Sequence, residues 1–380
     1  MTEFWQLPAP ARFLAGIVED LRAGQNVVVT LPDHTPDGWL SSLRTLLRNL
    51  GLHRLETVEN NGTAPLLCLA EHVGLESKPI RLRTIDLCER HEFHGRLLHL
   101  RADNPGGWPA WRKFLDEYED VCRRLNLAQR TLFFASLHGE VAAAAPAPKN
   151  LLRLHSWSGC LDSLNARLYA TSVLASEPLP AWQRQVFVAV LAELALWDPA
   201  VCEAGAGRGL AGVIDPGSWL AELGNARGWS ASDDATGSCA AWRGLRQEFD
   251  GCYRLHSAWL AVAGRRDTLL QRVWNGQVAA LFPLLERQRR ALLKTHRNLL
   301  RVPWRTTFGE IQRIADLELN HIAEQLSLQR SAGLRDLCEF VCWLRDIRND
   351  LAHLEPVRAS RLLDVRFRDR LAQVLIAEEE

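Results

Sequence analysis

The sequence predicts an α/β N-terminal domain, with a mostly parallel sheet and flanking helices, followed by an all-α helical-bundle C-terminal domain. Short apolar strand-like segments alternate with helical segments as far as residue 157, a pattern typical of parallel sheets covered by helices. Strand signals then fade, and from residue 240 amphipathic helical segments follow one another to the end of the chain. The apolar fraction of 47% and the charged fraction of 24% are typical of a globular protein with two or three domains.

Each predicted element of the N-terminal domain has its own signal. Apolar stripes at helical spacing predict helices at 11–23, 39–51 and 108–126. β-Branched and leucine-rich runs predict strands at 25–32, 81–88, 96–102, 130–137 and 151–157.

The rest of the chain is predicted to be helical. The predicted helices are 159–174, 180–198, 241–262, 266–299, 306–327, 331–353 and 359–377. Residues 203–237 contain GAGRG, DPGS and DDATGS, which indicates a linker or an ordered insertion. We therefore expect an α/β domain at 1–175, a helical and Gly/Ala-rich connector at 176–238, and an all-α domain at 239–380.

Charge and cysteine content limit the function classes. The 45 basic and 45 acidic residues cancel, so nucleic acid would have to bind a local basic patch. Nine scattered cysteines without a CxxC pair indicate reduced thiols and a cytoplasmic location. The N-terminal MTEFWQLPAP lacks the pattern of a signal peptide, and the apolar stretch 181–197 carries Gln, Arg and Glu, which indicates a buried helix.

The helix, buried strand, turn and helix at 11–51 resemble the start of a P-loop ATPase. In that family the turn is G-x-x-x-x-G-K-[ST], and its backbone N–H groups and lysine hold phosphates. Here the turn is LPDHTPDGW, which has no lysine and contains Asp33 and Asp37. The resemblance is therefore to a degenerate ATPase, and an ordinary α/β domain is the other interpretation. We expect no ATP hydrolysis, and we expect both aspartates to cap the following helix.

Near the end of the chain, WLRDIRNDLAHLEP contains Arg348, Asn349 and His353 on a predicted helix. An arginine can hold a phosphodiester, a histidine can move a proton and an asparagine can orient either partner. At 100° per residue these three side chains lie on a polar arc. The opposite, apolar face contains Leu344, Ile347, Leu351 and Leu354.

The segment RNDLAHLEP, which ends a long amphipathic helix, resembles the signature of HEPN domains. The family motif is an arginine, often followed by asparagine, and then a histidine after four to six residues. Arg348, Asn349 and His353 match it with four intervening residues. The segments 273–293 and 316–326 are similar to earlier helices of such domains. The resemblance covers roughly residues 240–380.

This resemblance implies a metal-independent endoribonuclease of a bacterial toxin or anti-phage defence system. RNA would be the substrate, its own 2′-OH the nucleophile, and Arg348, Asn349 and His353 the catalytic residues. The resemblance also implies a homodimer through the C-terminal domain, a possible antitoxin or defence partner encoded by a neighbouring gene, and no cofactor, metal or membrane. The alternative is a non-catalytic HEPN subunit that serves interaction or regulation in a defence complex.

Other groups of residues have simpler interpretations. The basic run 286–301 is an RNA-binding face or the solvated side of a helix. His91, His94 and His99 have the spacing of metal ligands but no Cys pair nearby, so we expect no zinc site there. Cys338 and Cys342 share the face of the motif and are expected to be small buried thiols at a dimer contact.

Overall fold

The computed structural model describes residues 4–51, 54–58, 64–75, 82–102, 106–307, 309–329 and 331–376. The chain divides into two compact units. The sheet unit comprises Thr2–Asn165 and Ser232–His256, and the helical unit comprises Ala166–Ala231 and Ser257–Glu380. The predicted segments 1–175, 176–238 and 239–380 follow the chain in order, whereas in the structure Ser232–His256 returns to the sheet unit.

The sheet unit contains a five-stranded parallel sheet in the order β2-β3-β4-β1-β5. Its strands are β1 (Asn26–Leu31), β2 (Leu55–Val58), β3 (Leu97–Ala102), β4 (Leu132–His138) and β5 (Leu152–Ser156). All six residues of β1 are buried, as expected for a central strand covered on both faces. The predicted α/β class of this region is confirmed, and a largely helical region follows it.

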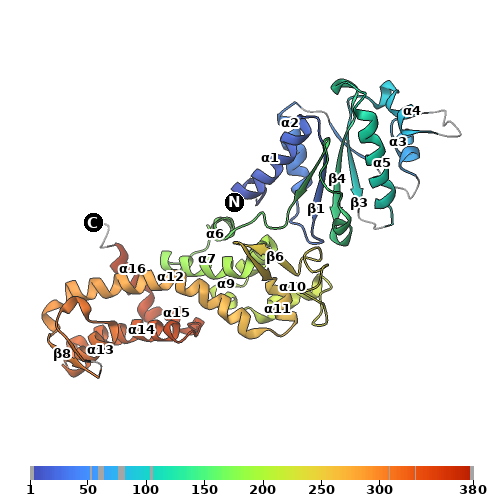
Figure 1. The fold of residues 1–380 in the computed structure, drawn as a ribbon. Coiled ribbons are helices and arrows are strands. Elements are labelled where there is room, and N and C mark those ends of the chain that lie inside the picture. The colour runs from blue at the N-terminus through green and yellow to red at the C-terminus, as the bar shows by residue number, and fades with distance from the viewer. Residues whose placement is uncertain are drawn as a thin grey trace. The chain divides into compact units, whose positions relative to one another are not determined.

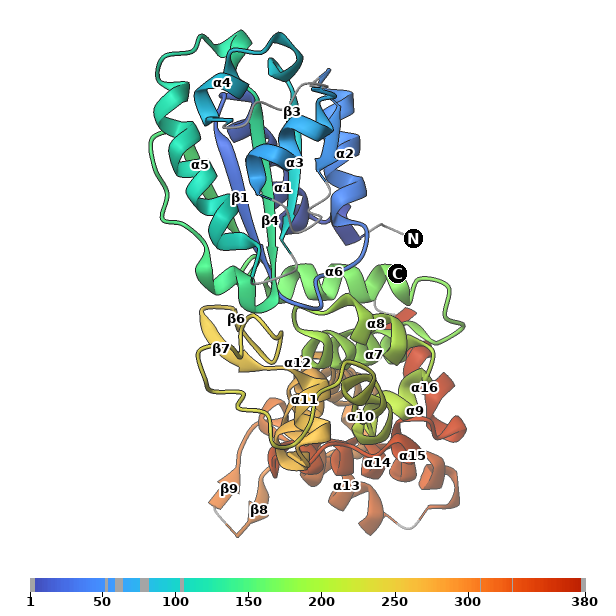
Figure 2. The same cartoon turned by 90° about the vertical axis from the view of Figure 1, so that its right-hand side faces the viewer.

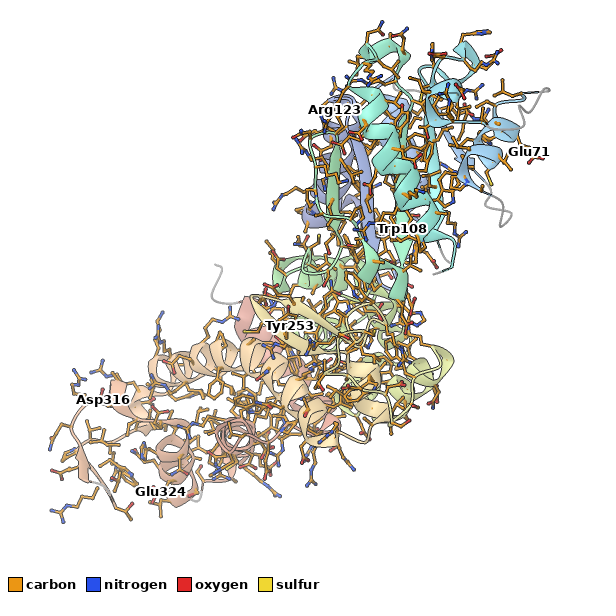
Figure 3. The ribbon with its side chains drawn as sticks, turned by 45° about the vertical axis from the view of Figure 1, so that its right-hand side comes forward. Glu71, Trp108, Arg123, Tyr253, Asp316 and Glu324 are labelled. Atoms are coloured by element: carbon orange, nitrogen blue, oxygen red, sulfur yellow. The ribbon has the colours of Figure 1, made fainter. Side chains whose placement is uncertain are left out.

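Helices cover both faces of the sheet (Figures 1 and 2). The helices α1 (Pro8–Arg22) and α2 (Trp39–Asn49) lie on one face. The helices α3 (Pro65–His72), α4 (Thr84–Cys88) and α5 (Trp108–Cys122) lie on the other. Trp108, Tyr118 and Phe133 are almost fully buried between α5 and the sheet, and Figure 3 shows Trp108 on α5.

Two parts of this unit differ from the prediction. The predicted strand 81–88 is wrong, because its described part forms the helix α4. Asp86 accepts hydrogen bonds from the Arg83 backbone N–H and guanidinium, which is a capping-box arrangement that starts a helix. The short strand β2 and the helix α3 were not predicted.

The helical unit is built around two long antiparallel neighbours, α7 (Ala181–Ala195) and α12 (Arg266–Thr295). Its other helices are α6 (Ser163–Val173), α8 (Pro199–Ala206), α9 (Gly209–Ile214), α10 (Gly217–Ala226), α11 (Ser257–Val262), α13 (Leu319–Leu328), α14 (Arg335–Ala352), α15 (Ala359–Leu362) and α16 (Val365–Ile376). The helices α8, α9 and α10 occupy most of 203–237, which is therefore an ordered segment rather than a flexible linker.

Two antiparallel hairpins replace predicted helix. The hairpin β6 (Arg246–Phe249) and β7 (Cys252–Leu255) lies inside the predicted helix 241–262, and Figure 3 marks Tyr253 on β7. The hairpin β8 (Trp304–Thr306) and β9 (Gly309–Ile311) takes the start of the predicted helix 306–327. Asp250 and Gly251 both have positive φ, 51° and 73°, as a two-residue hairpin turn requires.

Among the described residues, no helix is both long enough and apolar enough to cross a lipid bilayer.

Candidate active site

The helix α14 presents the candidate residues because its apolar face is fixed in the helical unit. Leu344, Ile347 and Leu351 are at most 1% exposed. The prediction for Leu354 is wrong, because this side chain is 70% exposed. The helix ends at Ala352, with His353 as its C-cap, so helical periodicity no longer places the residues beyond it.

Arg348 and His353 are exposed, and Asn349 is half-buried. In the part of the chain that the structure describes, no hydrogen bond or ion pair joins these three side chains to one another or to a neighbour. Five residues of helix separate two side chains by roughly 7.5 Å along the axis and about 140° around it. Arg348 and His353 are thus both available to solvent, and ideal helix geometry would point them in different directions.

The turn after α14 is a Schellman motif with a leucine in the left-handed position. Leu354 has a φ of 62°, and its N–H donates to the Leu351 carbonyl, while the Glu355 N–H donates to the Asp350 carbonyl at 2.9 Å. Glycine is the usual residue there, and a non-glycine residue costs about 1–2 kcal/mol. The site therefore contains local backbone strain next to His353.

Two side chains of α12 hold this turn in place. Gln277 is fully buried; its Nε2 donates to the Val357 carbonyl at 2.9 Å and its Oε1 accepts from the Val357 N–H at 2.7 Å. The Trp274 indole N–H donates to the Leu351 carbonyl at 2.8 Å. Neither residue was predicted from the sequence, although a glutamine among the apolar positions of a helix is a readable signal.

The charged neighbours of the motif are engaged elsewhere. Asp350 forms an ion pair with Arg361, and Arg345 forms one with Asp346 at 2.9 Å. Neither pair uses Arg348 or His353. Burial raises the pKa of the Cys342 thiol, with a smaller opposing effect of Arg345, so this half-buried thiol is held neutral.

The basic run 286–301 is partly structural. Arg289 and Arg290 both pair with Glu286, and hydrogen bonds from Arg289 lead the causes that lower the pKa of Glu286 to about 2. Arg289 also donates to the Ala315 and Leu317 carbonyls at 2.9 Å. The exposed cations of the run are Arg287, Arg290, Lys294, Arg297 and Arg301. Arg290 is paired with Glu286, so the positive surface free for a ligand is somewhat smaller than the sequence indicates.

The turn after β1 does not form a phosphate-binding loop. The prediction that Asp33 and Asp37 cap α2 is wrong, because Gly38 is the N-cap and no side chain caps the helix. The Asp33 N–H donates to the Trp242 carbonyl at 2.8 Å. A Cβ on Gly139, after β4, would lie 1.8 Å from Asp33 Oδ1. The chain's own carboxylate and the Ser232–His256 segment therefore occupy the carboxyl edge of β1 and β4.

We expect Asp33→Asn to raise the thermal unfolding midpoint at pH 7. Burial and then the charge of Glu140 raise the pKa of Asp33 above its ordinary value of 3.8, against a smaller effect of Arg243. Ionisation of Asp33 therefore destabilises the folded protein as the pH rises through the raised pKa of the folded state. Below the pKa of Asp33 in the unfolded chain, this destabilisation is absent. Unfolding scans across pH, with Asp37→Asn as control, test this. An Asp33→Asn advantage that persists at low pH would contradict it.

The side chains of His91, His94 and His99 contact separate partners and do not form a cluster. His94 contacts the Cys88 carbonyl at 2.8 Å, His91 contacts Glu92 and the buried His99 contacts Ser136 at 2.9 Å. Within the described ranges, no group of three or more His, Cys, Asp or Glu side chains has a metal-binding arrangement.

Compared with known proteins, the chain matches no family model and no curated protein sequence.

Proposed function

We propose that this protein is a cytoplasmic, metal-independent endoribonuclease of the HEPN type, acting in a toxin or anti-phage defence system. The observation that carries the proposal is the presentation of Arg348 and His353 in solvent at the end of α14. Both lack an ion-pair partner among the described residues, while Leu344, Ile347 and Leu351 on the opposite face of the helix are buried. A cation and a proton-transfer group with no structural task are suited to an external phosphodiester.

The proposed reaction is an intramolecular transesterification. The ribose 2′-oxygen attacks the adjacent phosphorus and loses its proton to an imidazole, and the P–O5′ bond breaks as O5′ takes up a proton. The products are a 2′,3′-cyclic phosphate and a 5′-hydroxyl, so neither water nor a metal ion is consumed. In this scheme His353 transfers protons, Arg348 stabilises the charge on the phosphorane and Asn349 orients either group.

A homodimer would bring together what a single chain separates. Arg348 lies on α14 and His353 is its C-cap, with directions that differ by about 140° in ideal helix geometry. The reaction needs one proton acceptor and one proton donor. A two-fold axis beside the end of α14 would place the residues of two copies around one phosphate. The exposed, strained Leu354 supports this, because a leucine that costs stability in one chain can stabilise a contact between two.

We expect Leu354→Gly to make the monomer more stable by about 1 kcal/mol, because glycine adopts a positive φ without strain. The same change should weaken self-association and lower RNA cleavage in parallel. Sedimentation velocity and thermal unfolding measure the two effects. Leu328→Gly is not a suitable control, because Leu328 lies in a helix. The companion variant is Leu354→Asn. Asparagine tolerates this positive φ, but the substitution removes the apolar contact. Unchanged self-association in both variants would contradict the proposed interface.

We propose a sensing or restraining role for the sheet unit. The proposal rests on the resemblance of the helix, buried strand, turn and helix at 11–51 to the start of a P-loop ATPase. The turn 32–38 has no lysine, and Asp33 and the Trp242 carbonyl take the place where phosphates would bind. A domain of this kind can change conformation without hydrolysing ATP.

The second candidate function is a non-catalytic HEPN subunit of a defence complex. The divergence of Arg348 and His353 in one chain favours it if the protein does not self-associate. Such a protein would bind RNA or a partner without turnover.

Incubation of the purified protein with total RNA in EDTA tests the proposed function. We expect cleavage into fragments that end in a 2′,3′-cyclic phosphate, and no cleavage of RNA with 2′-O-methyl groups. RNA that stays intact, with the protein folded and self-associated, would favour the non-catalytic alternative.

A further inference from the structure

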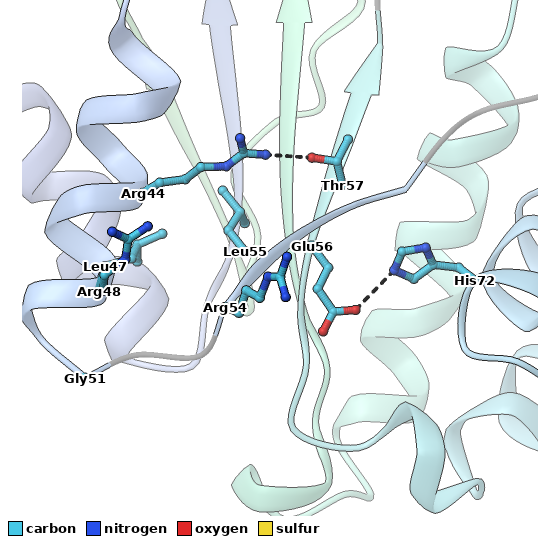
Figure 4. A pocket seen from close by; sticks show the side chains of 9 residues that line it. All are labelled: Arg44, Leu47, Arg48, Gly51, Arg54, Leu55, Glu56, Thr57 and His72. Carbon is cyan, nitrogen blue, oxygen red and sulfur yellow. Dashed lines mark hydrogen bonds and ion pairs between the residues drawn. The ribbon is translucent and has the colours of Figure 1, made fainter.

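A large cavity lies at the outer edge of the parallel sheet, away from the candidate active site. It measures about 1100 Å³. Its walls are the second half of α2, with Arg44 and Arg48, and the end of α3, with His72. Figure 4 shows β2 passing between these walls, with Arg54 on the chain just before it. In the part of the chain that the structure describes, β2 is the outermost strand on this side of the sheet.

The described lining of the cavity carries more positive than negative charge. Its lining contains one carboxylate, Glu56, among the described residues. Glu56 already accepts from Arg96 at 2.7 Å and from His72 at 3.2 Å. Arg48 and Arg54 have no ion pair within the described ranges, and Arg44 donates to the neutral hydroxyl of Thr57 at 2.9 Å. Three guanidinium groups thus border one space, and none of them has a carboxylate partner among the residues that the structure describes.

A hydrogen-bond chain from the interior orients one of these arginines. The Ser136 hydroxyl of β4 contacts His99 Nε2 at 2.9 Å, and His99 Nδ1 lies 3.5 Å from the Thr57 hydroxyl. Thr57 in turn accepts from Arg44. His99 and Ser136 are at most 1% exposed, so their side chains are fixed by packing. Arg44 is therefore held toward β2 before any ligand arrives, which lowers the entropy cost of binding.

The lining indicates the class of ligand. Among the described residues that line the cavity there is no Phe, Tyr or Trp, so bases would find no stacking surface. Arg44 and Arg48 are one helical turn apart, roughly 6 Å along the axis. Guanidinium groups bind phosphate oxygens through paired hydrogen bonds. The four-residue strand β2 is short for the addition of a peptide strand, which disfavours an acidic peptide.

We propose that this cavity is a binding site for ligands that carry several phosphate groups, with Arg44, Arg48 and Arg54 as the phosphate contacts. Two sources share this chemistry: the backbone of a single RNA strand and a free polyphosphate such as a nucleoside triphosphate. The site does not depend on the proposed nuclease, because it uses no residue of α14.

Equilibrium binding in EDTA tests the proposal with three probes: a short fluorescent 2′-O-methyl RNA, ATP and inorganic triphosphate. The combined variant Arg44→Ala, Arg48→Ala, Arg54→Ala should weaken binding by roughly tenfold for each arginine. For RNA it should also reduce the slope of log K against log salt by about 2. The matched control removes the same charge from exposed arginines of the same unit, Arg22, Arg112 and Arg124. It should bind like the parent.

Each outcome has a defined meaning. Tight RNA binding identifies a nucleic-acid backbone as the ligand, whereas tighter triphosphate or ATP binding identifies a free polyphosphate. Both support the site if only the cavity variant loses them. Equal losses in both triple variants, or displacement of every probe by poly-glutamate at equal charge, would overturn it. Variants of Arg348 and His353 should bind like the parent here, so failure of the nuclease proposal is distinguishable from failure of this one.

Discussion

Replacement of His353 with alanine is expected to lower RNA cleavage by about 100- to 10,000-fold, the usual contribution of a proton-transfer group. The fold should be unaffected, because His353 is exposed and its side chain makes no hydrogen bond among the described residues. Cleavage of a defined RNA in EDTA gives the rate, and thermal unfolding checks the fold. The control Glu355→Ala changes an exposed residue of the same turn and should leave the rate within a fewfold of the parent.

Arg348→Ala should lower the same rate by about 100- to 1,000-fold, because it removes stabilisation of the charge that develops on the phosphate. Arg348→Lys keeps the charge but loses the paired hydrogen bonds, and should restore a part of the activity. The matched control is Arg265→Ala, which removes an exposed arginine of the same unit. Parent-like cleavage by both His353→Ala and Arg348→Ala would show that these residues are not catalytic.

A mixture of the two inactive variants separates a shared site from two independent ones. A mixed dimer would have one intact Arg348 from the His353→Ala chain and one intact His353 from the Arg348→Ala chain. If one cleft uses both chains, the mixture should recover a measurable part of the lost activity. If each chain acts alone, the mixture should stay as inactive as its components, and the proposed dimeric site would be wrong.

The sequence predicted the sheet well because its central strands carry strong local signals. The strand β1 is buried on both faces, and the predicted range 25–32 contains Asn26–Leu31. Burial on both sides leaves a continuous β-branched run, which few other structures explain. Edge strand β2 has no such run, because its two middle residues, Glu56 and Thr57, line the cavity. Because β2 is not buried on both faces, it lacks this signal and was not predicted.

Two of the wrong secondary-structure predictions overlooked signals that the sequence contains. The hairpin of β6 and β7 turns at Asp250 and Gly251, and an Asp-Gly pair between short strands is a strong hairpin signal. The helix α4 has Asp86 three residues after Arg83, the spacing of a capping box. In both places the apolar pattern suggested a different element. At α4 the hydrogen bonds of Asp86 with Arg83 favour the helix, and between β6 and β7 the positive φ of Asp250 and Gly251 forms the turn.

The sequence predicts the helix that carries the candidate site, but not the conformation of the turn that ends this helix. The buried positions Leu344, Ile347 and Leu351 follow from periodicity alone. The left-handed conformation of Leu354 does not follow from periodicity. The turn that contains Leu354 is held by hydrogen bonds between Gln277 and Val357, which lie 80 residues apart in the chain. Long-range contacts of this kind are absent from local sequence patterns. The arginine cavity was missed for the same reason, since α2 and β2 form it jointly.

Gly276→Ala is expected to destabilise the helical unit strongly, because α12 packs there directly on the backbone of α7. A Cβ at Gly276 would lie 2.5 Å from the Val190 Cα, 2.7 Å from the Val190 nitrogen and 2.8 Å from the Ala189 oxygen. Backbone atoms cannot move aside as a side chain can, so the two helices must separate. Overpacking costs about 1–3 kcal/mol and rises when the backbone must shift, against roughly 1 kcal/mol gained from the helix propensity of alanine.

The net loss should be about 2 kcal/mol, which lowers the unfolding midpoint of the helical unit by roughly 4–8 °C. Gly217→Ala is the matched control, since it makes the same change at the start of α10, where a Cβ would meet nothing within 4 Å. That variant should be neutral or slightly more stable. Gln277 is the next residue of α12, so separation of the helices would also weaken its hydrogen bonds to Val357. RNA cleavage should then be slower. Equal stability of the two alanine variants would show that α7 and α12 do not pack this closely.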